Sequence, residues 1–153
     1  MVHFDAYAAD CRLYGQIELV EGRLSDQLNH TMESHVWDAR LVALADGHMV
    51  ATPELRVENA ELCAVVANGP RGDEARRLGT RTTRVETEVG PYRVVGRVHG
   101  PPTADPFAAV LKRGAWVPLT EATVTYRRGE EDISENVATL LVNRYLMRYF
   151  REL

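Results

Sequence analysis

Three short blocks of this chain occur twice in the same order, and this internal repeat constrains the fold more than any other feature of the sequence. The paired blocks are 11–17 with 92–98, 41–46 with 116–121, and 57–62 with 141–146. This alignment matches Gly15 with Gly96, Leu44 with Leu119, and Asn59 with Asn143. A duplicated unit predicts two related small folds packed side by side.

The repeat divides the chain of 153 residues into a first unit, 1–67, a linker, 68–80, and a second unit, 81–153. The linker combines glycine, proline and charged residues without any apolar period, which is typical of a surface loop. Units of this size bury little surface alone, so we expect them to share a core and not to fold separately. The expected core comprises Leu13, Ile17, Leu28, Leu44 and Leu62 in the first unit and Val94, Val98, Leu111, Leu119 and Leu146 in the second.

The apolar periods predict a mainly β protein with short helices, in which each unit runs strand, helix, strand, strand. Leu24 and Leu28 are four residues apart and predict one helical face, and Asp105 with Pro106 is typical of a second helix start. The apolar stretch 55–66 is interpreted as one strand, and 136–150 as a long strand bent near Asn143. An asparagine inside an apolar strand favours a bend or bulge.

Two resemblances follow from these residues. Gly15, the segment 23–29 (RLSDQLN) and the strand containing Leu44 and Asp46 resemble small uncharacterised bacterial domains, and this resemblance implies no function. More loosely, the bent strands are similar to Sm-like, SH3-type small barrels, with 140–146 in the place of the final Sm signature. The arginine–glycine pair that contacts RNA in that family is replaced by Asn143 and Arg144, and in the first unit by Asn59 and Ala60.

Charge and composition favour a cytoplasmic protein. The balance is −6 over residues 1–78 and +2 over 79–153, which suits self-association or an internal interface. The whole chain, at −4, is not basic enough for a dedicated nucleic-acid binder. No apolar run approaches a membrane span, and two cysteines without a signal pattern predict reduced thiols, Cys11 and Cys63.

The basic and aromatic residues of the second unit are the candidate contacts for nucleic acid. They are Arg127, Arg128, Arg144, Tyr145, Arg148 and Tyr149. Arginines would bind phosphate and tyrosines would stack on bases of a single strand. The alternative interpretation, which we favour, is a half-exposed strand whose arginines lie along apolar surface.

The sequence lacks catalytic and phosphate-binding motifs, so no catalytic, cofactor-binding or metal-binding residue is predicted and no cofactor is expected. His30, Glu33 and His35 would share part of a helical face, but a solvated helix end explains this pattern better than a metal site.

We therefore expect a non-enzymatic cytoplasmic interaction or scaffold module that binds protein or itself through an exposed strand edge, without a membrane. Weak RNA binding by an Sm-like protein is the first alternative, and a metal-dependent enzyme that brings His30, Glu33 and His35 together is the second.

Overall fold

The computed structural model of the protein describes residues 1–67, 81–100 and 114–153. These residues form ten strands, one α-helix and two short 3-10 helices. In the first part of the chain the elements are β1 (Val2–Ala8), β2 (Cys11–Ile17), α1 (Leu24–His30), β3 (Glu33–Ala43), β4 (Met49–Glu58), η1 (Asn59–Glu61) and β5 (Leu62–Val66). In the second part they are β6 (Arg81–Val89), β7 (Tyr92–Gly100), β8 (Trp116–Arg128), β9 (Glu131–Asn143), η2 (Arg144–Leu146) and β10 (Met147–Glu152).

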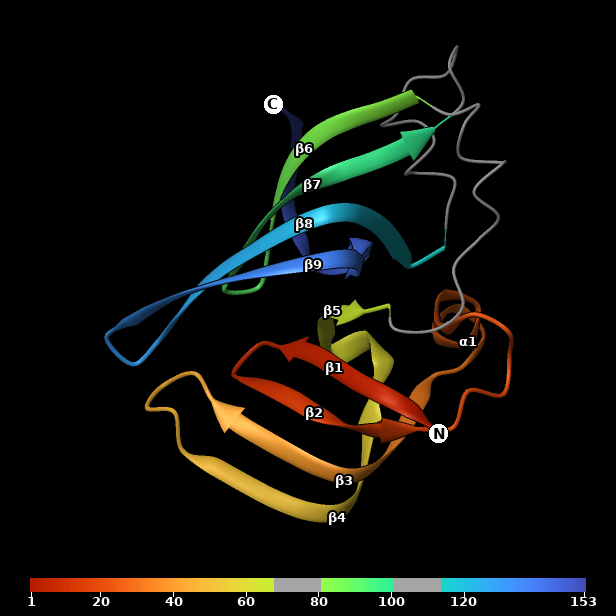
Figure 1. Ribbon diagram of the computed structural model, residues 1–153, viewed down its shortest axis with the longest axis vertical. Coiled ribbons are helices and arrows are strands. Elements are labelled where there is room, and N and C mark those ends of the chain that lie inside the picture. The colour runs from red at the N-terminus through yellow and green to blue at the C-terminus, as the bar shows by residue number, and fades with distance from the viewer. Residues whose placement is uncertain (68–80, 101–113) are drawn as a thin grey trace.

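All ten strands belong to one antiparallel sheet, in the order β10-β6-β7-β8-β9-β5-β1-β2-β3-β4. The predicted fold class, a β and α pair of Sm-like or SH3-type small barrels, is therefore wrong. The physical reason lies at β5, which pairs with β1 on one side and with β9 on the other. Hydrogen bonding thus continues from one half of the chain into the other, as Figure 1 shows at the centre of the molecule.

The two halves of this sheet have the same strand order. In the first half it is β5-β1-β2-β3-β4, and in the second β10-β6-β7-β8-β9. The registers correspond as well: Phe4 pairs with Gly15 as Val85 pairs with Gly96. The pairing of β2 with β3 shifts between Tyr14 and Gln16, and that of β7 with β8 shifts at the corresponding place, between Val95 and Arg97.

The same irregularity in the two halves explains the two glycines. At these bulges Asp38 and Glu121 adopt positive φ angles of 50° and 47°. A Cβ atom on Gly15 would lie 2.4 Å from Val36 Cγ1, and one on Gly96 would lie 3.1 Å from Leu119 Cβ. The strand opposite approaches too closely for a side chain, which is a common reason for glycine within a strand.

The structure corrects the alignment of the other two blocks. Leu119 takes the place of Val36 and not of Leu44, since each lies against the glycine of its own half. Asn59 is the first residue of η1, whereas Asn143 precedes η2 and caps it by accepting a hydrogen bond from the Tyr145 amide at 3.1 Å. Asn143 is the last residue of β9 and Asn59 follows the last residue of β4, so the strand expected to bend near Asn143 is interrupted there by η2.

Several predicted elements differ from those observed. The expected strand 55–66 is two strands separated by η1, and 136–150 is likewise divided by η2. Each half has five strands. The sequence did not predict β1, whereas β6 and β7 form the hairpin that the alternation of 82–89 and the turn at Gly90 and Pro91 predict. Helix α1 is present, and Leu24 and Leu28 are both buried on one face of it as predicted. The expected linker 68–80 and the helix after Asp105 lie outside the described residues.

The apolar core is divided into two clusters, and both contain residues from each half. Tyr7, Leu44 and Cys63 join the cluster of the second half, while Trp116 and Leu141 join that of the first. The predicted core residues that the structure describes are buried, except Leu146, which is 37% exposed in η2. Leu111 lies outside the described residues. The mixed clusters mean that each half buries apolar surface of the other.

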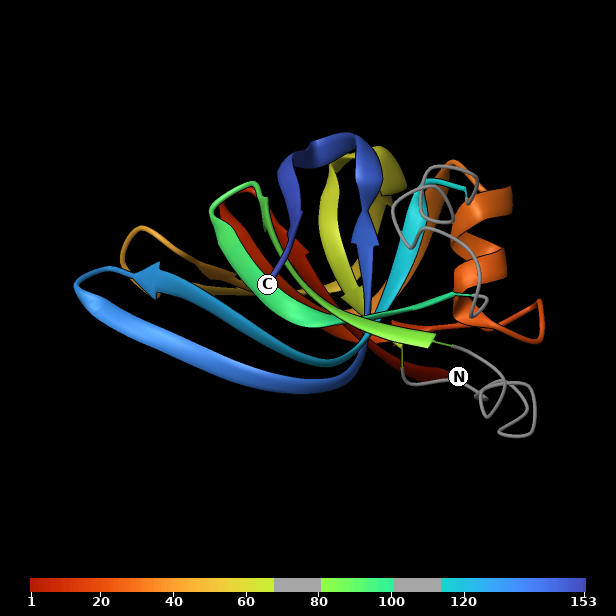
Figure 2. The ribbon, with the colours of Figure 1, turned by 90° about the horizontal axis from the view of Figure 1, so that it is seen from above.

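The two long hairpins, β3–β4 and β8–β9, end on the same side of the molecule, and α1 lies at the opposite end (Figures 1 and 2). The tips of these hairpins touch: the Gly129 amide donates a 2.7 Å hydrogen bond to the Leu44 carbonyl. No helix in the described part of the chain is long and apolar enough to cross a membrane.

Candidate interaction edges

The two terminal strands of the sheet, β4 and β10, are the candidate functional sites. Each pairs with a single neighbour in the sheet of described residues: β4 with β3, and β10 with β6. An edge strand presents a row of backbone donors and acceptors to an incoming strand, which makes it a template for binding another chain. A site of this kind needs no catalytic or metal-binding side chain.

Backbone hydrogen bonds at the ends of the two ladders show which backbone groups point outward. The Asn59 amide donates to the Met32 carbonyl at 2.9 Å, directly beyond the β3–β4 ladder. Because bonded and non-bonded pairs alternate in an antiparallel ladder, residues 54, 56 and 58 direct their amides and carbonyls away from β3. On β10, the Leu153 amide bonds to the Arg84 carbonyl at 3.0 Å, so residues 150 and 152 point away from β6, and the register shifts at Arg148.

The outer strand β4 combines exposed apolar and charged side chains. Met49 and Val50 are 55% and 52% exposed at its beginning. Leu55 and Val57 are half-buried against the core of the first half, while Glu54, Arg56 and Glu58 are exposed. Pro53 lies between these two segments, and proline on an edge strand limits pairing there. The segment best suited to accept a strand is therefore 54–58.

The other edge, β10, is held by charged contacts to β6 and β7. Glu86 is buried and receives hydrogen bonds from Arg151 Nη2 at 2.6 Å, from Tyr149 Oη at 2.9 Å and from Arg93. The Arg93, Tyr149 and Arg151 bonds lower the pKa of Glu86 to about 2. Arg148 pairs with Glu88 at 2.8 Å. These contacts position β10 as a defined outer strand.

The junction of β5 with β9 shows how one such edge is already used inside the chain. Ala64, Val65 and Val66 pair with Val142, Leu141 and Leu140. The Ala67 amide extends the ladder with a 2.9 Å bond to the Thr139 carbonyl, and Asn143 Nδ2 donates to the Leu62 carbonyl at 3.0 Å. In the second half β9 holds the place that β4 holds in the first, and β10 holds the place of β5.

A buried arginine strengthens this junction. Arg12 is 1% exposed and donates to Asp5 Oδ1 at 2.6 Å, to the Ala6 carbonyl at 2.6 Å and, across the junction, to Glu135 Oε1 at 3.3 Å. Its guanidinium lies 3.6 Å from the centre of the Tyr7 ring, whose hydroxyl also donates to Glu135 at 3.2 Å. A buried guanidinium requires such partners, because removing a charge from water is costly.

Three tyrosines complete the contact between the halves. Tyr7 packs edge-to-face against Tyr92 and Tyr126, with ring centres 5.0 Å and 6.2 Å apart. The Tyr92 hydroxyl donates to the Ala8 carbonyl at 2.6 Å, and burial raises the pKa of Tyr126 to about 12. These phenols are therefore neutral packing groups, and no catalytic acid or base is formed by them.

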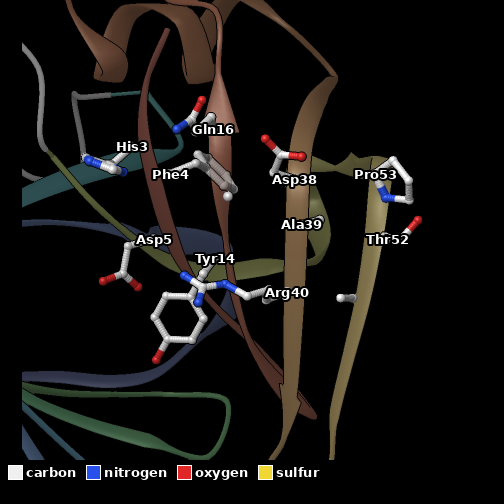
Figure 3. A pocket seen from close by; sticks show the side chains of 12 residues that line it. His3, Phe4, Asp5, Tyr14, Gln16, Asp38, Ala39, Arg40, Thr52 and Pro53 are labelled. Atoms are coloured by element: carbon white, nitrogen blue, oxygen red, sulfur yellow. The ribbon is translucent and has the colours of Figure 1, made fainter.

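A hollow of about 980 Å³ lies on the face of β1–β4 (Figure 3). Gln16 and Asp38 lie at one end of it, and Asp5, Tyr14 and Arg40 gather at the other. The second half has a smaller hollow of about 280 Å³ at the corresponding bulge, where Glu121 replaces Asp38. There Glu121 pairs with Arg97 at 3.0 Å, whereas Gln16 takes the place of that arginine in the first half.

The candidate nucleic-acid contacts do not form one basic surface. Arg127 and Arg128 are at the β8–β9 tip, where they pair with Asp132 at 3.4 Å and Glu131 at 3.6 Å. Arg144 and Tyr145 lie together in η2, with the guanidinium 4.9 Å from the ring centre. Arg148 and Tyr149 belong to β10 and contact Glu88 and Glu86. Carboxylates thus accompany most of these cationic groups.

The histidine motif is not a metal centre in the described residues. His30 ends α1 and its Nδ1 lies 2.9 Å from Glu21 Oε2, while Glu33 and His35 are in β3, not in a helix. His35 Nε2 lies 2.6 Å from Glu54 Oε1, and its ring stacks on Trp37. No group of three or more potential metal ligands occurs in the described ranges. Cys11 and Cys63 are free thiols, and burial raises the pKa of Cys63 to about 11.

Sequence reasoning missed the ion pairs of Arg12 and Glu86. A signal was present, because the first repeated block has an arginine at the same position in both copies, Arg12 and Arg93. These arginines bind Asp5 and Glu86, which occupy corresponding positions in β1 and β6. A charged residue repeated at the same place inside two apolar strands indicates that each half forms an ion pair at that position.

Comparison of the chain with family models, with curated proteins and with solved structures finds no match.

Proposed function

We propose that this protein is a non-enzymatic interaction or scaffold module of the cytoplasm that binds protein through the outer edge of its sheet. The observation that carries the proposal is the segment 54–58 of β4, an outward-directed edge beside half-buried Leu55 and Val57. An added strand gains backbone hydrogen bonds along such an edge, and pockets for alternate side chains provide specificity.

The chain itself supports this mode of binding. Its β9 strand binds the edge of β5 over a short ladder, with apolar side chains on both strands. Short edge-to-edge pairing is thus a contact that this architecture already forms. The arginines considered for RNA binding offer less support, since Arg127, Arg128 and Arg148 each pair with a carboxylate.

A proline substitution on the edge tests the proposal. Arg56→Pro removes an amide directed away from β3, so the inner ladder is retained while the outer edge is blocked. Ala51→Pro is the matched control, because the Ala43 amide bonds to the His48 carbonyl and alternation therefore directs the amide of residue 51 away from β3, before Pro53. Both variants are first compared with the wild type by circular dichroism and thermal unfolding.

The readout is the set of proteins that co-purify with the tagged chain from its native cell, with bound RNA and metal measured in the same sample. We expect a defined protein partner that is lost with Arg56→Pro and retained with Ala51→Pro. Stoichiometric zinc, or RNA whose binding falls steeply with salt, in place of a protein partner would contradict the proposal.

A further inference from the structure

Because the two halves share one strand order, the free edges of the sheet are the counterparts of the two strands that meet inside it. The internal junction joins β9 of the second half to β5 of the first. The counterpart of β9 is β4, and the counterpart of β5 is β10. These are the two strands at the ends of the sheet, so each molecule carries both sides of the same contact, one at each end.

We propose that a second copy of this chain is the partner, and that β10 of one copy pairs antiparallel with β4 of the next, as β5 pairs with β9 within the chain. This inference rests on the proposed use of the β4 edge and names its occupant. A contact between two different surfaces is heterologous, so repetition produces a ring if the rotation closes and a filament if it does not.

The internal junction also predicts the register. Its pairs are Ala64 with Val142, Val65 with Leu141, and Val66 with Leu140. The strand pairings identify the counterparts. Ala64 pairs with Tyr7 as Tyr149 pairs with Glu88, so Tyr149 is the counterpart of Ala64. Asn143 pairs with Trp116 as Glu58 pairs with Glu33, so Glu58 is the counterpart of Asn143. The corresponding pairs between copies are Tyr149 with Val57, Phe150 with Arg56, and Arg151 with Leu55.

The orientation of the backbone agrees with this register. At the internal junction residues 139 and 67 form a hydrogen-bonded pair. Their counterparts are residues 54 and 152, and both belong to the sets that point away from their own neighbouring strands. The pair 56 with 150 follows by alternation. Backbone donors therefore face acceptors at both of these proposed pairs.

Side chains at the end of the proposed ladder are complementary in charge. Continued one residue beyond the counterparts of Ala64 and Val142, the register brings Glu58 of one copy beside Arg148 of the next. Directly opposite charges of unlike sign stabilise an antiparallel pair. The remaining side chains are less apolar than those of the internal junction, so the contact between copies is expected to be weaker and reversible.

Sedimentation velocity of the full chain over a wide range of concentration tests the inference. We expect concentration-dependent association beyond a dimer for the wild type and for Ala51→Pro. Arg56→Pro should weaken association about tenfold or more, since it removes an outward amide at the centre of the ladder. A wild type that remains monomeric throughout, or an Arg56→Pro variant that associates normally, would overturn the inference.

A charge reversal tests the register separately. Arg148→Glu places like charges opposite each other and should weaken association about fivefold or more. Its control, Glu88→Gln, breaks the same intrachain ion pair but leaves Arg148 to face Glu58, and should associate like the wild type. Glu58→Arg combined with Arg148→Glu should restore association, and failure of this double variant to do so would contradict the register.

Mixing distinguishes pairing of unlike edges from pairing of like edges. Arg56→Pro keeps an intact β10, and Arg148→Glu keeps an intact β4, so an equimolar mixture should form a dimer that neither variant forms alone. Normal association of Arg148→Glu by itself would show a β4-to-β4 contact and overturn the inference. The proposed function would survive a monomeric wild type if Arg56→Pro still lost a different protein partner, so the two failures are distinguishable.

Discussion

The two halves of this molecule have the same ladders, but only the first has its fifth strand covered. β5 receives β9 on its outer side, whereas β10, its counterpart, is the last strand of the sheet. The side chains differ accordingly: β5 is almost wholly buried, while Arg148, Arg151 and Glu152 of β10 are exposed. The same architecture therefore carries an apolar sequence where an edge is permanently paired and a charged one where it is open.

The repeated arginine shows the same difference. Arg12 lies 1% exposed at the junction, where it binds Asp5 and reaches Glu135 of β9. Arg93 binds Glu86 with its side chain 60% exposed, because no strand covers that side of the second half. The arginine of the first pair, Arg12, is thus part of the interface between the halves, whereas the arginine of the second, Arg93, is exposed to solvent.

The largest difference between the halves is expected from replacing these arginines. Arg12→Met should lower the free energy of unfolding by about 2 kcal/mol or more, because it leaves two carboxylates and the Ala6 carbonyl without a buried donor. Arg93→Met should lower the free energy of unfolding clearly less, since Glu86 still accepts hydrogen bonds from Arg151 and Tyr149. Urea denaturation of both variants measures the difference, and equal losses would contradict the distinction between junction and surface.

Replacing the two bulge glycines, Gly15 and Gly96, by alanine should also destabilise the first half more than the second, with a smaller difference between the two losses. Gly15→Ala forces a Cβ to within 2.4 Å of Val36 Cγ1 and 2.8 Å of the Trp37 carbonyl, and should cost about 2–3 kcal/mol. Gly96→Ala meets its nearest atom at 3.1 Å and should cost about 1 kcal/mol. Thermal unfolding measures both variants. A larger loss for Gly96→Ala would show that the two bulges are packed differently from this description.

Much of this organisation could be predicted from the sequence, but the connection between the halves could not. The repeated glycines marked the correspondence between the halves, Asn143 marked the end of β9, and Leu24 with Leu28 marked α1. The alignment of Leu44 with Leu119 failed because an apolar residue followed by an acidic one recurs in many strands. The single sheet was missed because pairing of β5 with β9 depends on which edge remains uncovered, and a local apolar pattern is the same for a strand in a barrel and in an open sheet.

The sequence predicted the kind of site, an exposed strand edge, but not which strands form it. Any open sheet has two exposed edges, and only the strand order shows that they are β4 and β10. The candidate nucleic-acid residues were chosen by charge alone. In the structure a carboxylate lies beside three of the arginines, and the pairs are Arg127 with Asp132, Arg128 with Glu131, and Arg148 with Glu88. Ion pairs across strands depend on register, which a single sequence does not specify.

A smaller effect is expected from acid on the contacts that hold β10. The pKa of Glu86 is about 2 in the folded protein and has an ordinary value of 4.5, so its contribution to stability is present above pH 4.5 and is lost as the pH falls toward 2. Glu86→Gln should be less stable than the wild type at neutral pH, and the two should converge in acid. Denaturation midpoints measured across this range test the prediction, and a constant difference at all pH values would contradict it.

Amide hydrogen exchange measured residue by residue by NMR tests the central claim most directly, because it compares the covered and open edges at corresponding positions. In dilute protein the amides of Leu141, Asn143, Val65 and Ala67, at the internal junction, should be protected. Those of Arg56, Glu58, Phe150 and Glu152, at the two ends of the sheet, should exchange rapidly and gain protection as the concentration rises. Rapid exchange at the internal junction, or end-strand amides whose exchange is independent of concentration, would contradict the account.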